Sequence, residues 1–86
     1  MELKQNQIVK IRRGDVGVVM SFKNKPSLLV FNSFVSPLGR FTDKLKHKSK
    51  SDYDIIGVYE GKVESYTDVY AKRFDLSKLK AVYVEG

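Results

Sequence analysis

The residue types best suited to chemistry gather in one basic stretch in the middle of the chain. It contains the only histidine, and six of its eleven residues are cationic or titratable bases: Arg40, Lys44, Lys46, His47, Lys48 and Lys50. Phe41 lies inside this stretch and Tyr53 lies just beyond it. Proteins that bind single-stranded nucleic acid use cations for phosphates and exposed aromatic rings for stacking. We therefore predict contacts with a partner or with phosphate from Arg40, Phe41, Lys44, Lys46, His47, Lys48 and Tyr53.

The same composition argues against catalysis and metal binding. The chain has no cysteine, which excludes a thiolate nucleophile and thiolate metal ligands. A Ser-His-Asp arrangement would need His47, whose neighbours Lys46 and Lys48 disfavour the imidazolium that such a mechanism forms. We expect His47 to be a surface or loop-packing residue, with a ligand contact as the alternative. The expectation is a protein that is not an enzyme, with no catalytic residue, metal or cofactor.

Acidic residues lie on both sides of the basic stretch. Asp52 and Asp54 are spaced like the opening of a calcium loop, but Ile56 and Val63 stand where oxygen ligands are needed. We instead predict that the acidic residues order the loop on the domain, by capping it or by pairing with its lysines. The residues with this predicted role are Asp43, Asp52 and Asp54.

Length and charge indicate one small domain with an excess of cations. The 86 residues form a single predicted domain, 1–86, and 42% of them are hydrophobic, which is enough for one core. The net charge is +6, and residues 1–50 alone carry 11 Lys and Arg against 3 acidic residues. Such asymmetry indicates an anionic partner, or simply charge that keeps the protein in solution. No apolar run approaches the roughly 20 residues that span a bilayer, and no signal peptide is recognisable, so we expect a cytoplasmic protein without a membrane partner.

Short stretches of β-branched and aromatic residues predict an all-β fold. The clearest is Ile55 to Tyr59, expected to be the central strand, and the others are 8–12, 16–22, 27–31, 62–66, 69–74 and 80–84. The segment 75–79 predicts one 3-10 or helical turn before the last strand. About five to seven short strands with such a turn favour a small SH3-like barrel, with an OB-fold as the rival.

The sequence also indicates where the aromatic side chains lie and where the chain forms a long loop. Most of the ten Phe and Tyr side chains are expected in the core, whereas Phe34, Phe41 and Tyr53 are expected to be exposed beside the basic stretch. Residues 32–51 show no sustained period and predict a long irregular loop, of a kind that is often functional. Alternatively, part of it forms a short strand or helical turn, most plausibly at 43–48.

The segment from Phe41 to Gly61 carries the pattern D-x-L-x-H-K followed by D-Y-D-I-I-x-V-Y. Its residues are Asp43, Leu45, His47, Lys48, Asp52, Tyr53, Asp54, Ile55, Ile56, Val58 and Tyr59. This pattern resembles a family of small phage and prophage proteins. The resemblance implies an SH3-like barrel and an accessory role in a phage, and it brings no activity with it.

These observations lead to three hypotheses about function. The first is a non-enzymatic phage or prophage accessory module that engages a host macromolecule in the host cytoplasm through residues 40–50. The second is a nucleic-acid or nucleotide-binding barrel, with phosphates bound by the cations of the basic stretch and by Arg12 and Arg13, and with Tyr53 or Phe41 for stacking. The third is a self-assembling part. The expected partner is thus a host protein or nucleic acid, and the expected state is a monomer or a small homo-oligomer.

Overall fold

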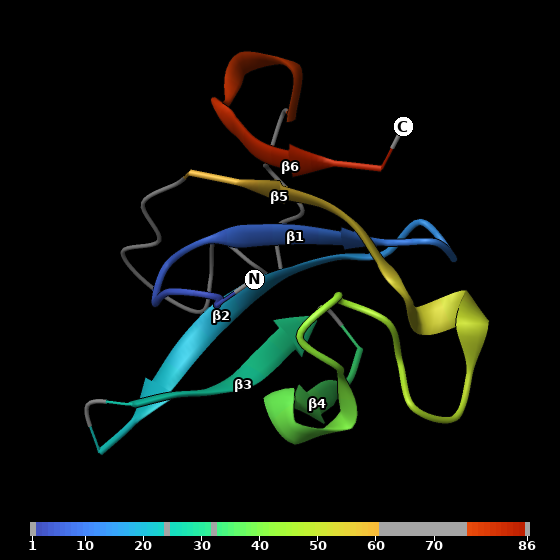
Figure 1. Ribbon diagram of the computed structural model, residues 1–86. Helices are drawn as coiled ribbons and strands as arrows, with labels where there is room; N and C mark the ends of the chain where they lie inside the picture. The colour runs from blue at the N-terminus through green and yellow to red at the C-terminus, as the bar shows by residue number, and fades with distance from the viewer. Residues whose placement is uncertain (1, 24, 32, 61–75, 86) are drawn as a thin grey trace.

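The described part of the chain forms one antiparallel sheet of six strands, in the order β4-β3-β2-β1-β5-β6 (Figure 1). The computed structural model describes residues 2–23, 25–31, 33–60 and 76–85. The strands are β1 Ile8–Ile11, β2 Val16–Phe22, β3 Lys25–Phe31, β4 Val35–Pro37, β5 Ile55–Tyr59 and β6 Ala81–Val84. Three 3-10 turns join them, namely η1 Leu38–Arg40, η2 Ser51–Tyr53 and η3 Leu76–Lys78. The predicted all-β class is confirmed.

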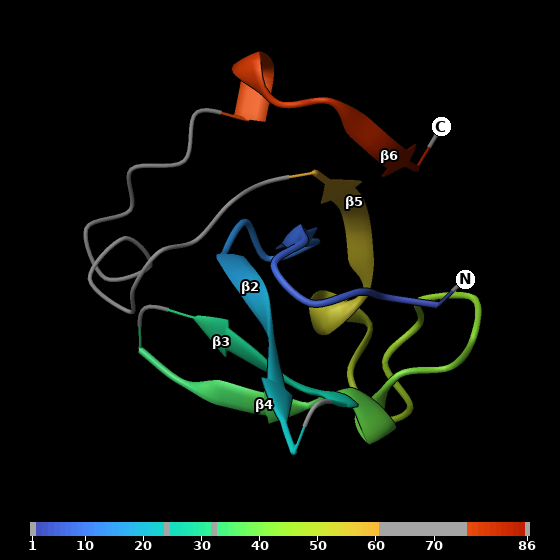
Figure 2. The ribbon, with the colours of Figure 1, turned by 90° about the vertical axis from the view of Figure 1, so that its left-hand side faces the viewer.

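The sheet formed by the described residues is open. Its edges are β4 and β6, and Figure 2 shows it bending between these two strands. Register shifts between Lys10 and Ile11, between Met20 and Ser21, and between Val58 and Tyr59 contribute to the bend, because bulges increase local twist. Closure into a barrel stays a prediction.

The expectation that Ile55 to Tyr59 is the central strand is wrong. β5 lies between β1 and the edge strand β6, whereas β1 and β2 occupy the middle of the sheet. The reason is that β5 pairs with β1 and with β6, so that, among the described strands, three lie beyond β1 on one side of β5 but only β6 lies on the other. Burial of β5 comes instead from the loop before it, which covers the face that carries Ile55 and Val58.

Both faces of the sheet carry buried side chains, because residues alternate in direction along a strand. On β1, Val9 and Ile11 join the larger cluster, whereas Ile8 joins a smaller one on the opposite face. The larger cluster comprises Leu3, Val9, Ile11, Val19, Leu29, Phe31, Leu45, Ile55 and Val58. The smaller cluster comprises Ile8, Val18 and Val30, with Leu76 and Leu79 among the residues packed against it. The chain between β4 and β5 supplies much of the cover over the larger cluster.

The long connection predicted for residues 32–51 is more ordered than expected. It contains the short strand β4 and the turn η1, and both lie before 43–48, the place favoured for a short element. Only three residues form β4, and they include a serine and a proline, so no alternating apolar pattern marks it. The predicted strands 62–66 and 69–74 lie outside the described residues, whereas η3 matches the turn expected before the last strand.

Two further features complete the description of the fold. Gly17 on β2 lies against Phe31 on β3, where an added Cβ would be 2.7 Å from the aromatic ring. None of the helical segments in the described ranges has the length and apolar character that a bilayer-spanning helix requires.

Candidate functional site

Residues 40–50, here called the basic loop, fold back on themselves as two short arms. Phe41 and His47 form an isolated antiparallel bridge. On one side of it the Lys48 N–H donates to the Arg40 carbonyl oxygen, and on the other the Thr42 N–H donates to the Lys46 carbonyl oxygen, both at 2.8 Å. The pairing places the backbone of Arg40 opposite that of Lys48, and the Phe41 and His47 rings meet edge-on.

Leu45 connects the two arms and attaches them to the sheet. Its φ of +64° places it in the left-handed region, which is uncommon for a residue other than Gly or Asn. Its side chain is 3% exposed and belongs to the larger core cluster. Its carbonyl oxygen accepts the N–H of Ile55 at 2.9 Å, so the turn of the basic loop is tied to the start of β5.

Asp54 holds the second arm of the basic loop, which contains His47, through its side chain. Its Oδ1 accepts the N–H of His47 at 2.7 Å, and its side chain is only 10% exposed. Its Oδ2 lies 3.9 Å from Arg12 Nη2 and 3.8 Å from Lys46 Nζ. A carboxylate that accepts a backbone N–H and faces two cations keeps the loop and the ends of β1 and β5 in one arrangement.

His47 braces the chain that follows it. Its Nδ1 accepts the N–H of Ser49 at 3.1 Å and that of Lys50 at 2.9 Å. Its ring meets those of Phe41 and Tyr53 edge-on, with centroids 5.1 and 5.3 Å away. An Nδ1 that accepts two N–H groups carries no proton, so the ring acts here as a packing and hydrogen-bonding centre.

The aromatic rings beside the basic loop are half-buried, which corrects the expectation that Phe34, Phe41 and Tyr53 are exposed. All three pack against the larger core cluster. Phe34 stacks between Phe31 and Tyr53, with centroid distances of 4.5 and 5.7 Å. The Arg13 guanidinium lies 5.0 Å from the Tyr53 centroid, and Lys50 Nζ lies 5.6 Å from it. The three rings therefore pack between the basic loop and the core. Core contacts and neighbouring cations cover much of their surfaces.

Arg13 is positioned by the turn that follows β1. Its guanidinium contacts both carboxylate oxygens of Asp15, at 2.7 and 3.1 Å, and donates to the Tyr53 hydroxyl at 3.2 Å. Gly14 makes the turn possible with a φ of +107°. The hydrogen bond with Asp15 is the main reason that the pKa of Arg13 is raised.

One cation of the basic loop, Lys46, and one beside it, Arg12, are paired with a carboxylate from a distant part of the sequence. Arg12 Nη2 lies 2.8 and 2.9 Å from the two carboxylate oxygens of Glu85, at the end of β6. Lys46 Nζ lies 3.5 Å from Glu85 Oε1. The hydrogen bond from Arg12 has the largest effect on the pKa of Glu85 and lowers it; burial opposes this, and the charges of Arg12 and Lys46 add smaller lowering effects. The same hydrogen bond raises the pKa of Arg12.

The other cations of the basic loop differ in this respect. Among the described residues, no carboxylate lies within ion-pair distance of the four side chains Arg40, Lys44, Lys48 and Lys50. All four are exposed. They form the part of the predicted site whose charge is available to a partner, and we call them the open cations.

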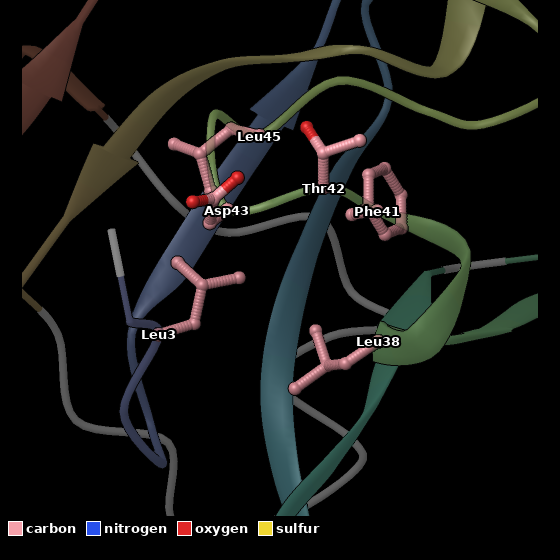
Figure 3. Close-up of a pocket in the computed structure, with 6 residues that line it drawn as sticks. All are labelled: Leu3, Leu38, Phe41, Thr42, Asp43 and Leu45. Carbon is pink, nitrogen blue, oxygen red and sulfur yellow. The ribbon is translucent and has the colours of Figure 1, made fainter.

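The remaining predicted site residues have separate positions. Asp52 is exposed in η2, where its carbonyl oxygen accepts the N–H of Arg13 at 2.9 Å. Asp43 is exposed and lines an open hollow of about 200 Å³ beside the basic loop. Figure 3 shows this hollow, which is lined by Leu3, Leu38, Phe41, Thr42, Asp43 and Leu45. Thus the loop presents exposed cations and, next to them, a hollow whose lining is partly apolar and partly polar.

Sequence reasoning missed one member of this site. It is Glu85, because nothing in the local sequence marks its pairing with Arg12, which is 73 positions away. In the described part of the chain, no group of three or more His, Cys, Asp and Glu side chains could hold a metal ion. No protein-family model, no curated protein and no solved structure matches this chain.

Proposed function

We propose that this protein is a non-enzymatic module that binds the phosphate backbone of nucleic acid through its basic loop. The observation that carries the proposal is the pairing of the two arms, which places Arg40 opposite Lys48 along the backbone while both side chains stay exposed. Lys44 at the turn and Lys50 beyond the second arm add two more open cations. Exposed cations held on an ordered loop provide the sequence-independent attraction that phosphates require.

The state of the aromatic rings favours backbone contacts over base recognition. A stacking platform needs an accessible ring face, but Tyr53 is flanked by Arg13 and Lys50, and Phe34 lies between two other rings. Stacking would require these contacts to be broken. The proposal therefore assigns affinity to the open cations, and little discrimination between base sequences.

The test is the salt dependence of oligonucleotide binding, measured by fluorescence anisotropy with labelled single-stranded and duplex DNA of several sequences. Replacing both Arg40 and Lys48 by Gln removes two exposed cations on opposite arms of the loop and should weaken binding equally on all sequences. The slope of log affinity against log salt should fall by about 1.4 on single strands and about 1.8 on duplex.

A matched control separates a local contact from net charge. Lys25→Gln combined with Lys80→Gln makes the same change in net charge at two exposed positions outside the loop. Lys25 begins β3, at the opposite end from Phe31, where the aromatic stack begins. The control should keep the wild-type slope. If the two double variants change the slope equally, or if the wild type binds no nucleic acid at low salt, the proposal fails.

A second candidate function, binding of a protein partner, is favoured by the hollow shown in Figure 3. Leu3, Leu38, Phe41 and Leu45 line it with apolar surface suited to an anchoring side chain. Thr42→Trp would fill the hollow, and Thr42→Val is its control, since both remove the hydroxyl that accepts from Lys44 and Lys46. A host protein retained at high salt after nuclease by wild type and T42V, but not by T42W, would support this candidate. Equal retention by all three proteins would exclude the hollow as the contact.

The proposal also includes an SH3-like barrel fold and an accessory role in a phage. The six-stranded antiparallel sheet and the turn η3 before its last strand support an SH3-like barrel, which the resemblance to phage and prophage proteins also implies. That resemblance further supports an accessory role in the cytoplasm of an infected host. A module of this kind would act by binding alone.

A further inference from the structure

The open cations do not account for all of the positive charge around the basic loop. Arg12 and Lys46 lie next to them, yet their charges face the Glu85 carboxylate. Lys46 is on the same arm as Lys48, two residues away, and Arg12 is attached to the loop through Asp54. The geometry around Glu85 therefore bears on how far the phosphate-binding surface extends.

Glu85 is held in the way that a phosphate would be held. One terminal nitrogen of Arg12 reaches both carboxylate oxygens, at 2.8 and 2.9 Å, and Lys46 Nζ approaches one of them from the loop at 3.5 Å. An arginine and a lysine that converge on two oxygens of one anionic group are typical of phosphate recognition. The side chains of Arg12 and Lys46 are 44% and 49% exposed, so an external anion can reach them.

We propose that Arg12 and Lys46 form a second phosphate-binding subsite, which the Glu85 carboxylate occupies in this structure. The inference rests on the proposed function, since the ligand is a phosphate of the same nucleic acid backbone. In this arrangement Glu85 competes with the ligand and limits the affinity of the protein. A backbone bound by Arg40 and Lys48 would continue onto Lys46 and Arg12 once Glu85 is displaced.

Asp54 lowers the attraction of this subsite without filling it. Its Oδ2 is 3.9 Å from Arg12 and 3.8 Å from Lys46, beyond hydrogen-bond distance, while its Oδ1 is engaged by the N–H of His47. Asp54 thus holds the two cations near each other, and Glu85 makes the close contacts. The carboxylate that an external anion can displace is therefore that of the partly exposed Glu85 rather than that of the buried Asp54.

The test is Glu85→Gln, which removes the competing charge and keeps a side chain of nearly the same shape. With labelled oligodeoxythymidine as the probe, E85Q should bind about 3- to 10-fold more tightly than wild type, as expected for two partly exposed cations that are set free. Its salt slope should be steeper by about 1.4, because two further phosphate contacts release counterions. Circular dichroism and thermal unfolding verify that the variant is folded.

Two comparisons make the result specific. Glu2→Gln adds the same charge at an exposed residue outside the loop and should leave the slope unchanged. Adding Arg12→Gln to E85Q should remove most of the gain in affinity and slope. If wild type binds and E85Q has the same affinity and the same salt slope, this inference is overturned and the proposed function stays intact. Absence of binding by the wild type would overturn the proposed function and, with it, this inference.

Discussion

Asp54 should be the residue on which the order of the basic loop depends most. Its carboxylate is 10% exposed and accepts the N–H of His47 at 2.7 Å, in the middle of the second arm. Replacing Asp54 by Ala leaves that N–H without its partner and removes the charge that faces Arg12 and Lys46. The variant should therefore lose stability and, locally, the folded-back shape of the loop.

The magnitude follows from these contacts. A hydrogen bond to a charged group contributes about 1.5–3 kcal/mol. The two ion pairs are partly exposed, and their 3.9 and 3.8 Å separations place them at the weak end of the usual range of about 0.2–1 kcal/mol each. We expect Asp54→Ala to lower the free energy of unfolding by about 2–3 kcal/mol. For a domain of this size, that corresponds to a fall in Tm of about 10–20 °C.

Two variants separate the contributions. Asp54→Asn keeps an oxygen that can accept from His47 but removes the charge, so it should cost about 1 kcal/mol. Asp52→Ala removes an exposed carboxylate two residues away and should stay within about 0.5 kcal/mol of wild type. Urea unfolding gives these values, and the m-value shows whether the unfolding transition has changed in extent.

Hydrogen exchange at the His47 amide reports whether its hydrogen bond with Asp54 is kept. The exchange rate should rise strongly in D54A and change little in D52A. The reasoning would be refuted if D54A unfolded within about 0.5 kcal/mol of wild type, a difference typical of a surface substitution. It would also be refuted if Asn at position 54 cost as much as Ala, since the retained acceptor would then have no value.

Two further predictions concern packing and pH. Gly17→Ala would place a methyl group 2.7 Å from the Phe31 ring and 3.0 Å from the Val30 carbonyl oxygen, and should cost about 1–3 kcal/mol in urea unfolding, whereas Gly39→Ala, with open space around it, should cost far less. A G17A protein as stable as wild type would contradict this account of the β2–β3 contact. The pKa of Glu85 is lowered from its ordinary 4.5 by Arg12 and Lys46, so its stabilising contribution is present above pH 4.5 and is lost as the pH falls through the lower folded value. The difference in Tm between wild type and E85Q should therefore shrink on acidification below pH 4.5, and a difference that grew would show that Glu85 stabilises the fold in another way.

Local patterns in the sequence predict much of the sheet. β2 has alternating apolar residues and β5 is rich in β-branched ones, and both begin and end where they were expected. β4 was missed because three residues that include Ser36 and Pro37 carry no period. The position of β5 beside an edge was missed because strand order depends on pairing between distant segments, which no local pattern encodes.

The site was predictable in its composition but not in its arrangement. The cations of the basic loop are evident in the sequence, whereas their division into open and paired cations depends on Glu85. The folded-back loop depends on a hydrogen bond from the His47 backbone to Asp54, seven residues away, and on Leu45 in a left-handed conformation that its residue type does not favour. Such contacts become visible only once the chain is folded.

The most direct test of the central claim is to map nucleic acid binding residue by residue. Titrating labelled protein with oligodeoxythymidine and following backbone amide shifts by NMR locates the contact without any substitution. The proposal predicts that the largest shifts fall at Arg40, Lys44, Lys48 and Lys50, with smaller shifts at Arg12 and Lys46. Shifts centred on Lys25 or Lys80, or an unchanged spectrum at low salt, would show that the basic loop is not a phosphate-binding surface.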